Sequence, residues 1–238
     1  MLREIRKKLV ILHNRRPFPE QVRSYLTDLE KREWLYMNLR LSGSSLRQED
    51  IDTVLQGGCI LSAPIEEHLM ITRLEELRQY IYRLSDMEAD LSLQMIRDMH
   101  TILSGSAAKD FRKGNPVLLE YGASPLLPGE IPGEMAGLVD FARKREEGEN
   151  LFLKAARLHN RCMEVYPYSE KTPELARAIL YYTLVRNGLP MAALELSEEE
   201  YNQEIAAYLA GGGSQPLADH LMHAVRNRLE LMIQLTGR

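Results

Sequence analysis

Apolar residues recur at every third or fourth position along most of the chain, and this spacing restricts the fold more than any other feature. After Pro19, for example, apolar side chains stand at Val22, Leu26, Leu29 and Leu35. A repeat close to 3.6 residues directs one face of a helix toward a core. The sequence therefore predicts a mainly α protein, with a short basic N-terminal helix and further helices at about 19–41, 50–55, 64–84, 89–103, 133–145, 151–165, 173–187, 197–209 and 216–235.

Two serines followed three residues later by glutamate predict where helices begin. Ser85 with Glu88 is expected to cap the helix from residue 89, and Ser197 with Glu200 the helix that runs to Leu209. In such a capping box the serine side chain accepts from a free backbone N–H while the glutamate reaches back to the cap residue.

The segment from Gly105 to Gly133 is rich in glycine and proline, so it is not expected to hold a long helix. Within it, Val117-Leu118-Leu119-Glu120-Tyr121 favours an extended conformation. With a turn at Gly122 and a second strand at about 124–126, it is expected to form a small β-hairpin.

Composition limits the classes of function. The net charge of −4 argues against a general nucleic-acid surface, although six basic residues lie within the first sixteen. That cluster is interpreted as one solvated helix face, with a phosphate or anionic-lipid contact as the alternative. Cys59 and Cys162 have no metal-type spacing, and no uncharged stretch is long enough for a signal peptide or a membrane span. We expect a cytoplasmic protein.

Residues 158–177 form the most informative segment: a helix, a short proline-containing loop, and a second helix with Pro173 in its first turn. The free N–H groups of a helix N-terminus point into such a loop and make a corner suited to anions.

This segment resembles the catalytic motif of the Fic family, which reads His-Pro-Phe, any residue, Asp/Glu, Gly-Asn-Gly-Arg, two residues, Arg. In register, the motif falls on Tyr166-Pro167-Tyr168, Glu170, 171–174 and Arg177, with His159 at the position of an earlier family histidine. The surrounding segments 99–103, 110–112, 117–121 and 125–132 resemble the family as well, over roughly Leu41 to the C-terminus. The resemblance implies a Fic-type helical bundle in which a β-hairpin flap at 117–121 docks a target protein.

The resemblance also implies impaired chemistry. Tyr166 replaces the histidine base, and a phenol with a pKa near 10 is a poor base at neutral pH. Lys171 and Pro173 replace the glycines of the phosphate nest, and Glu174 replaces the arginine that holds the terminal phosphates. Glu170 stands at the Mg²⁺ position. Residual phosphate binding is assigned to Lys171, Thr172 and Arg177.

Many family members carry an inhibitory helix whose glutamate pairs with the first motif arginine. The matching segment here is 38–43, which puts Ser42 at the glutamate position, so both members of that ion pair are replaced. The alternative is that Ser42-Gly43 is simply a helix end.

Three hypotheses follow. The chain is a Fic-type pseudo-enzyme that binds a protein partner through the flap, or an active transferase that moves AMP or another phosphate-containing group onto a protein hydroxyl, or a helical binding protein in which nothing of the family's function remains. Only the second needs Mg-ATP or another phosphate donor. We expect no membrane contact, and the sequence leaves an oligomer open.

The expected units are an N-terminal helical segment (1–47), a Fic-like core (48–210) and a C-terminal helix packed on it (211–238).

Overall fold

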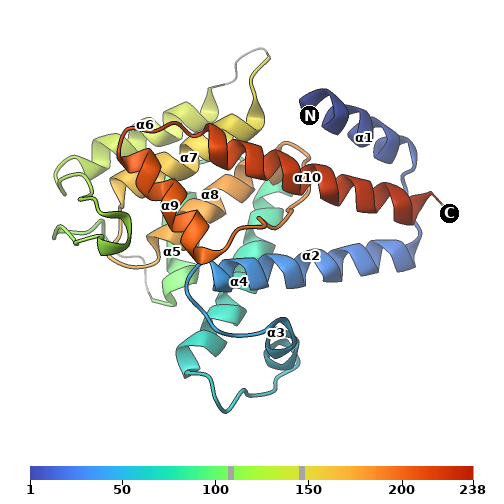
Figure 1. Ribbon diagram of the computed structural model, residues 1–238, viewed down its shortest axis with the longest axis horizontal. Coiled ribbons are helices and arrows are strands. Elements are labelled where there is room, and N and C mark those ends of the chain that lie inside the picture. The colour runs from blue at the N-terminus through green and yellow to red at the C-terminus, as the bar shows by residue number, and fades with distance from the viewer. Residues whose placement is uncertain (107–109, 145–147, 238) are drawn as a thin grey trace.

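The computed structural model describes residues 1–106, 110–144 and 148–237. Over these ranges the chain forms ten α-helices and one short 3₁₀ helix, η1 (Figure 1). They are α1 (Leu2–Asn14), α2 (Glu20–Arg40), α3 (Gln48–Leu55), α4 (Ile65–Asp86), α5 (Leu93–Ser104), η1 (Leu119–Tyr121), α6 (Ile131–Arg143), α7 (Leu151–Val165), α8 (Thr172–Arg186), α9 (Glu198–Leu209) and α10 (Gln215–Thr236). The prediction of a mainly α protein is confirmed.

Helix α8 lies at the centre of the molecule. It packs against α4, α5 and α7, and apart from Pro173 every residue from Thr172 to Val185 is buried. A helix that is covered on all sides has no solvent-facing stripe. Its polar residues, among them Glu174 and Arg177, therefore need hydrogen-bond or ion-pair partners inside the protein.

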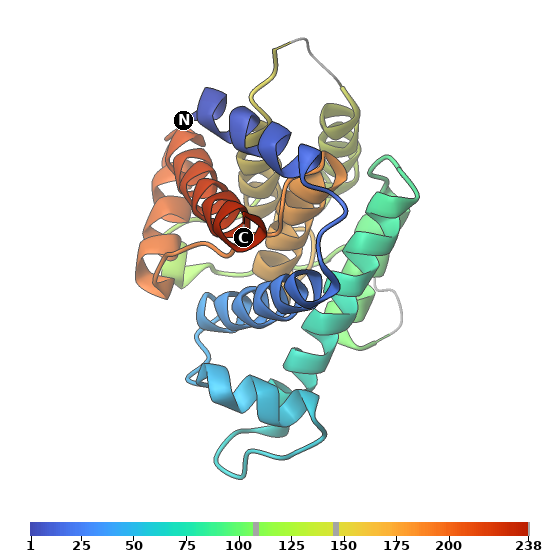
Figure 2. The ribbon, with the colours of Figure 1, turned by 90° about the vertical axis from the view of Figure 1, so that its right-hand side faces the viewer.

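The two ends of the chain pack together on one side of this centre. Helix α1 lies along α10, and α10 in turn contacts α7 and α2 (Figures 1 and 2). On α1 the side chains of Ile5 and Leu12 are buried in the same apolar core as Trp34 of α2. The N-terminal helix is therefore part of the core.

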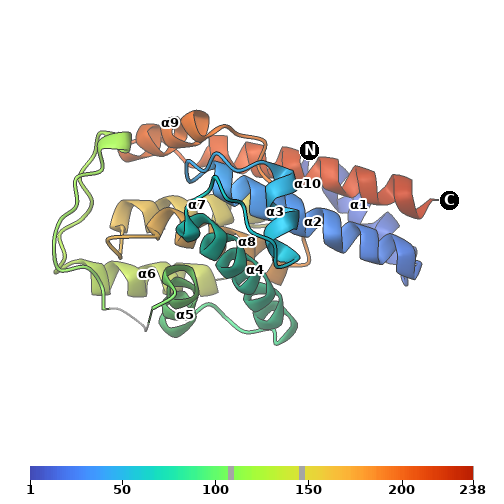
Figure 3. The same ribbon diagram turned by 90° about the horizontal axis from the view of Figure 1, so that it is seen from below.

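The predicted β-hairpin is wrong, because the described residues contain no β-strand. Leu118 and Ala123 form one isolated antiparallel bridge, and η1 occupies the turn between them (Figure 3). Continued pairing would bring Pro116 opposite Pro125, and neither residue has the N–H that a β-ladder needs. The segment therefore closes as a tight turn ending at Gly122, whose φ is +60°.

The predicted cap at Ser85 is also wrong. Ser85 belongs to α4, and its hydroxyl donates to the carbonyl of Val185 at 3.3 Å. The helix that follows begins later, at Ser92, whose side chain accepts from the N–H of Met95. The capping box of Ser197 and Glu200 is confirmed.

Arg145, the expected last residue of one helix, and Arg238, the end of the expected C-terminal unit, lie outside the described residues. In the part of the chain that the structure describes, no helix combines the length and apolar character needed to cross a membrane.

Candidate functional site

The loop between α7 and α8, residues 166–171, holds the backbone in an unusual conformation at both ends. Tyr166 ends α7 with φ +47°, and Lys171 precedes α8 with φ +62°. Side chains other than glycine rarely adopt positive φ, because Cβ then crowds the backbone. In the described ranges only Glu88 shares this conformation among non-glycine residues. The loop is thus a place where the surrounding structure imposes local strain.

Arg112 holds this loop in place. Its Nε donates to the carbonyl of Tyr166 at 2.6 Å and its Nη2 to that of Val165 at 3.2 Å, while its own N–H donates to the carbonyl of Pro167 at 3.0 Å. Further bonds reach the carbonyls of Gly114 and Leu126. One buried guanidinium therefore ties the segment before η1 to the end of α7.

The tyrosines of the loop point into the protein. Tyr168 is 3 % exposed and stacks on the His100 ring, with centroids 3.6 Å apart. Thr172 donates to the carbonyl of Tyr168 at 2.8 Å and accepts from its N–H at 3.3 Å. His100 in turn donates from Nε2 to the backbone carbonyl of Glu170 at 3.2 Å. The polar groups of the loop are thus largely bonded within the protein.

Tyr166 is poorly suited to remove a proton. Burial, followed by the nearby carboxylates of Glu120 and Glu174, raises the pKa of its phenol to about 12. Both influences disfavour the negatively charged phenolate. At neutral pH the group is a proton donor, and its side chain is only 7 % exposed.

A buried polar cluster lies at the start of α8, where it meets the end of α2. Ser42 donates to Oε1 of Glu174 at 3.2 Å and accepts from Nη2 of Arg177 at 2.7 Å. Arg177 is fully buried, and its Nε donates to the side-chain oxygen of Asn38 at 2.8 Å. Nζ of Lys171 lies 3.6 Å from the Glu174 carboxylate. The Glu174 carboxylate therefore has both a hydroxyl donor and an ammonium group beside it.

Asn38 was not singled out from the sequence. A detectable signal did exist, because an asparagine on the apolar face of a predicted helix requires a buried partner. It is 1 % exposed, and it holds Arg177 with both its side chain and its backbone carbonyl.

His159 belongs to α7 and lies beside this cluster. Its Nε2 accepts from the hydroxyl of Tyr201 at 2.6 Å, and Nδ1 donates to Oδ1 of Asn160 at 2.8 Å. Burial is the main cause that lowers its pKa to about 4, with the positive charge of Arg177 acting in the same direction. The imidazole is neutral at physiological pH.

Solved structures with the same arrangement are known. A Fic domain-containing signaling protein from Bacteroides thetaiotaomicron superposes with a TM-score of 0.83 at 20 % identity, covering 98 % of this chain and 97 % of that one. Fic-1 from C. elegans gives 0.83 at 17 % identity, covering 98 % of this chain and 72 % of that one. A Fic family protein from Desulfovibrio desulfuricans gives 0.70 at 14 % identity over 99 % of this chain and 75 % of its own.

The chain has the Fic fold. No family model and no curated protein matches the sequence.

Within this fold, the positions matched to the Fic motif gather at the junction of α7 and α8. Ser42, at the position of the inhibitory glutamate, contacts both Glu174 and Arg177. The other predicted residues lie apart from this cluster: Thr172 is bonded to Tyr168, and Glu170 is exposed at the loop surface. Of the predicted flap, Tyr121 is buried whereas Val117 and Leu119 face outward.

At the positions matched to the Fic motif, this chain carries a different pattern of charge from the motif itself. In the ranges that the structure describes, no group of three or more His, Cys, Asp or Glu side chains is arranged to hold a metal ion. The carboxylate of Glu174, already bonded to Ser42, lies in the first turn of α8, where a Fic phosphate would need positive charge. Lys171 adds a side chain where the Fic nest has glycine.

Proposed function

We propose that this chain is a Fic-fold protein without nucleotidyl-transfer activity, which acts as a protein-binding module through residues 117–127. The observation that carries the proposal is the buried placement of Glu174, whose carboxylate accepts from Ser42 while Ser42 in turn accepts from Arg177. It fills the phosphate-holding end of α8 with a buried carboxylate, which repels a polyanionic donor.

The state of Tyr166 supports the same conclusion. A group that accepts a proton from a target hydroxyl works best with a pKa near the operating pH. The Tyr166 phenol, with a pKa raised to about 12, is far from that condition. The replaced base at Tyr166 and the replaced phosphate site at Glu174 thus both favour a protein without transfer activity.

The surface around η1 supports a binding role. Val117, Leu119 and Leu127 are exposed by 76 %, 84 % and 62 %, while Leu118 between them is buried. Several large apolar side chains exposed along one segment favour a role in protein contacts. Because only one bridge pairs this segment, we propose contact through side chains and not addition of a β-strand.

Two free cysteines, Cys59 at the surface and Cys162 in the interior, agree with a reducing compartment, so we propose a cytoplasmic location.

Isothermal titration with Mg-ATP tests the absence of a donor site. We expect no binding in the micromolar range for the wild-type chain and for Glu170→Ala alike. Micromolar binding that Glu170→Ala abolishes would contradict the proposal, because it would show a working Mg²⁺–phosphate site.

A second experiment addresses transfer from other donors. The chain is incubated with labelled nucleotides and labelled phospho-alcohol donors, together with candidate target proteins. We expect no labelled protein. Label that appears with the wild type and disappears with Glu170→Ala would instead favour an active transferase, the alternative in which AMP or another phosphate-containing group moves to a protein hydroxyl.

Partner binding is tested separately with Leu119→Asp. The variant should lose a partner that the wild-type chain retains at the same concentration, while the same change at a leucine outside this surface, Leu61→Asp at a side chain 97 % exposed, should retain it.

A further inference from the structure

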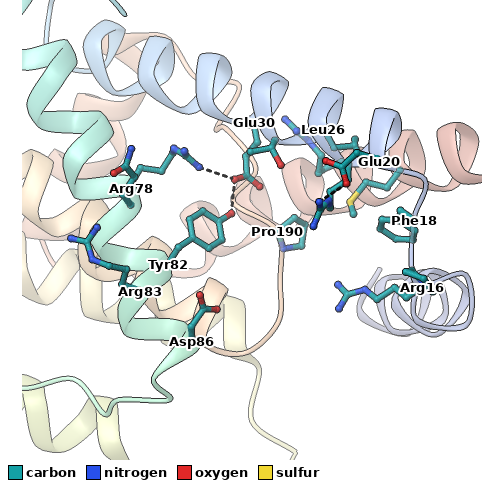
Figure 4. A pocket seen from close by; sticks show the side chains of 16 residues that line it. Arg16, Phe18, Glu20, Leu26, Glu30, Arg78, Tyr82, Arg83, Asp86 and Pro190 are labelled. Atoms are coloured by element: carbon teal, nitrogen blue, oxygen red, sulfur yellow. Dashed lines mark hydrogen bonds and ion pairs between the residues drawn. The ribbon is translucent and has the colours of Figure 1, made fainter.

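A large cavity lies away from the motif loop, on the side where α1 connects to α2. It measures about 1240 Å³, is open to solvent, and is lined by the connection 16–18, by α2, α4 and α10, and by Pro190 after α8 (Figure 4). Small-molecule sites usually measure roughly 300–1000 Å³, so this space is large enough for a ligand the size of a short peptide.

The floor of this cavity is a completed polar network. The Tyr82 hydroxyl donates to Oε1 of Glu30 at 2.5 Å, and Nη1 of Arg78 lies 3.7 Å from the same oxygen. Arg78 also binds Glu75 through two hydrogen bonds of 2.8 and 3.0 Å. Arg78 is only 8 % exposed, so the network is fixed by packing. The network forms a rigid floor, and its polar groups need no ligand to complete their hydrogen bonds.

Two opposite charges at the rim lack such partners. Among the described residues, neither Arg16 nor Asp86 makes an ion pair or a hydrogen bond through its side chain. The Arg16 guanidinium contacts only the Phe18 ring, 5.9 Å from its centroid. Figure 4 shows Arg16 reaching into the cavity from one wall and Asp86 on the opposite wall.

The other rim charges are already engaged. Arg23 pairs with Glu20, and Arg83 is directed away from the cavity in Figure 4. Arg228 pairs with Glu33 at the α10 wall. The available charge is therefore polarised, with a cation on one side and a carboxylate on the other.

Apolar groups make up another part of the lining. Phe18, Leu26, Pro190 and Met232 line the cavity together with the ring of Tyr82. We propose that this cavity binds a small zwitterion with an apolar middle, of the class of a short peptide with both ends free, whose carboxylate meets Arg16 and whose ammonium group meets Asp86. The planar guanidinium suits a carboxylate. The inference does not depend on the proposed function, because the cavity shares no residue with the motif loop.

Isothermal titration with the tripeptide Ala-Phe-Ala tests the proposal. The free tripeptide should bind, and blocking its carboxyl end as an amide or its amino end with acetyl should each weaken binding about two- to fivefold, the effect of one lost ion pair at an exposed side chain. Arg16→Gln should weaken binding of the free tripeptide to a similar extent, and amidation should then cost nothing more. Asp86→Asn should likewise weaken binding of the free tripeptide, and acetylation of the amino end should then cost nothing more.

Two exposed residues outside the cavity provide matched controls. Arg6→Gln and Asp28→Asn remove the same charges without touching the lining and should leave the affinity unchanged. Four results would overturn the inference: no binding of the free tripeptide in the millimolar range, indifference to both end caps, equal effects of the rim and control variants, or end-cap effects that persist in full in Arg16→Gln and Asp86→Asn. Arg16 and Asp86 are exposed, so unchanged circular dichroism should show that the variants fold.

Discussion

At the scale of single residues, Lys171 shows how the backbone of the loop departs from what its side chain prefers. Its φ of +62° is natural for glycine and strained for lysine. We predict that Lys171→Gly is more stable than Lys171→Ala by about 0.5–1 kcal/mol, although glycine costs more entropy on folding. Both variants remove the ammonium group near Glu174, so the difference in urea unfolding isolates the backbone effect.

An ordinary helical position provides the control. His223 is exposed within α10, and there alanine should be more stable than glycine by about 1 kcal/mol. If the alanine variant is more stable than the glycine variant at both positions, the backbone at Lys171 is not strained.

The second prediction at this scale concerns His159, whose pKa is lowered from 6.5 to about 4 in the folded protein. Between these values the unfolded chain binds a proton that the folded protein does not. Stability therefore rises with pH across this window and falls as the pH drops from 6.5 toward 4. At about pH 5 the loss attributable to His159 should be roughly 2 kcal/mol relative to neutral pH.

The measurement compares wild type with His159→Gln by urea unfolding at several pH values. Carboxylates and other histidines titrate in both proteins, so the difference between the two curves reports His159. Because the variant lacks the buried imidazole, its disadvantage should shrink as the pH falls below 6.5. A difference that stays constant from about pH 7 to 4.5 would contradict the assignment.

Residue-scale features were only partly predictable from the sequence. Replacement of the motif residues could be read from the register, and the resemblance implied that positions 42 and 174 meet. The bond between Ser42 and Arg177 could not be predicted, because it depends on how the end of α2 meets α8. For Asn38 the sequence indicated that a buried partner is needed but not that the partner is Arg177.

At the scale of elements, the start of α5 shows why helix ends are harder to predict than helices. Ser85 and Ser92 both precede apolar periodic residues, but only Ser92 accepts the backbone bond of a cap. Helix α4 continues through Ser85 because its face toward the core, with Ile81 and Leu84, remains buried to that point. Burial thus overrides a local capping pattern.

These two serines provide a matched prediction. Ser92→Ala should destabilise the protein by about 1 kcal/mol, because it leaves an N–H at the start of α5 without an acceptor. Ser85→Ala should cost a few tenths of a kcal/mol, since it removes one long bond of 3.3 Å to the carbonyl of Val185. Guanidinium unfolding of the two variants under the same conditions decides between them, and equal costs would contradict the assignment of the cap.

The β-hairpin predicted around η1 was wrong for a different reason. Its composition is typical of strands, but a hairpin requires two partners that can both pair, and proline at 116 and 125 prevents this. The pairing partner is a non-local property, whereas α7 and Ser197 were predicted well because periodicity and capping act within a few residues.

At the scale of the whole molecule, the question is whether α1 is an appendage or a part of the core. Chain length allows both. In the structure Leu12 of α1 is 3 % exposed and belongs to the same buried cluster as Trp34 of α2, which is 0 % exposed. Because α1 packs on α10, and α10 on α7, loss of α1 should weaken the entire assembly.

We therefore predict that Leu12→Ala lowers the free energy of unfolding by about 2–4 kcal/mol and shifts one cooperative transition as a whole. Trp34 is the single tryptophan, so its fluorescence reports the core near α2 while far-UV circular dichroism reports all helices. The two probes should give the same midpoint in wild type and variant. Val10→Ala, at a side chain 60 % exposed on the same helix, should change neither midpoint appreciably. If α1 were an appendage, Leu12→Ala would reduce the helical signal early and leave the Trp34 transition in place, because the core would then unfold independently of the helix that lost its anchor.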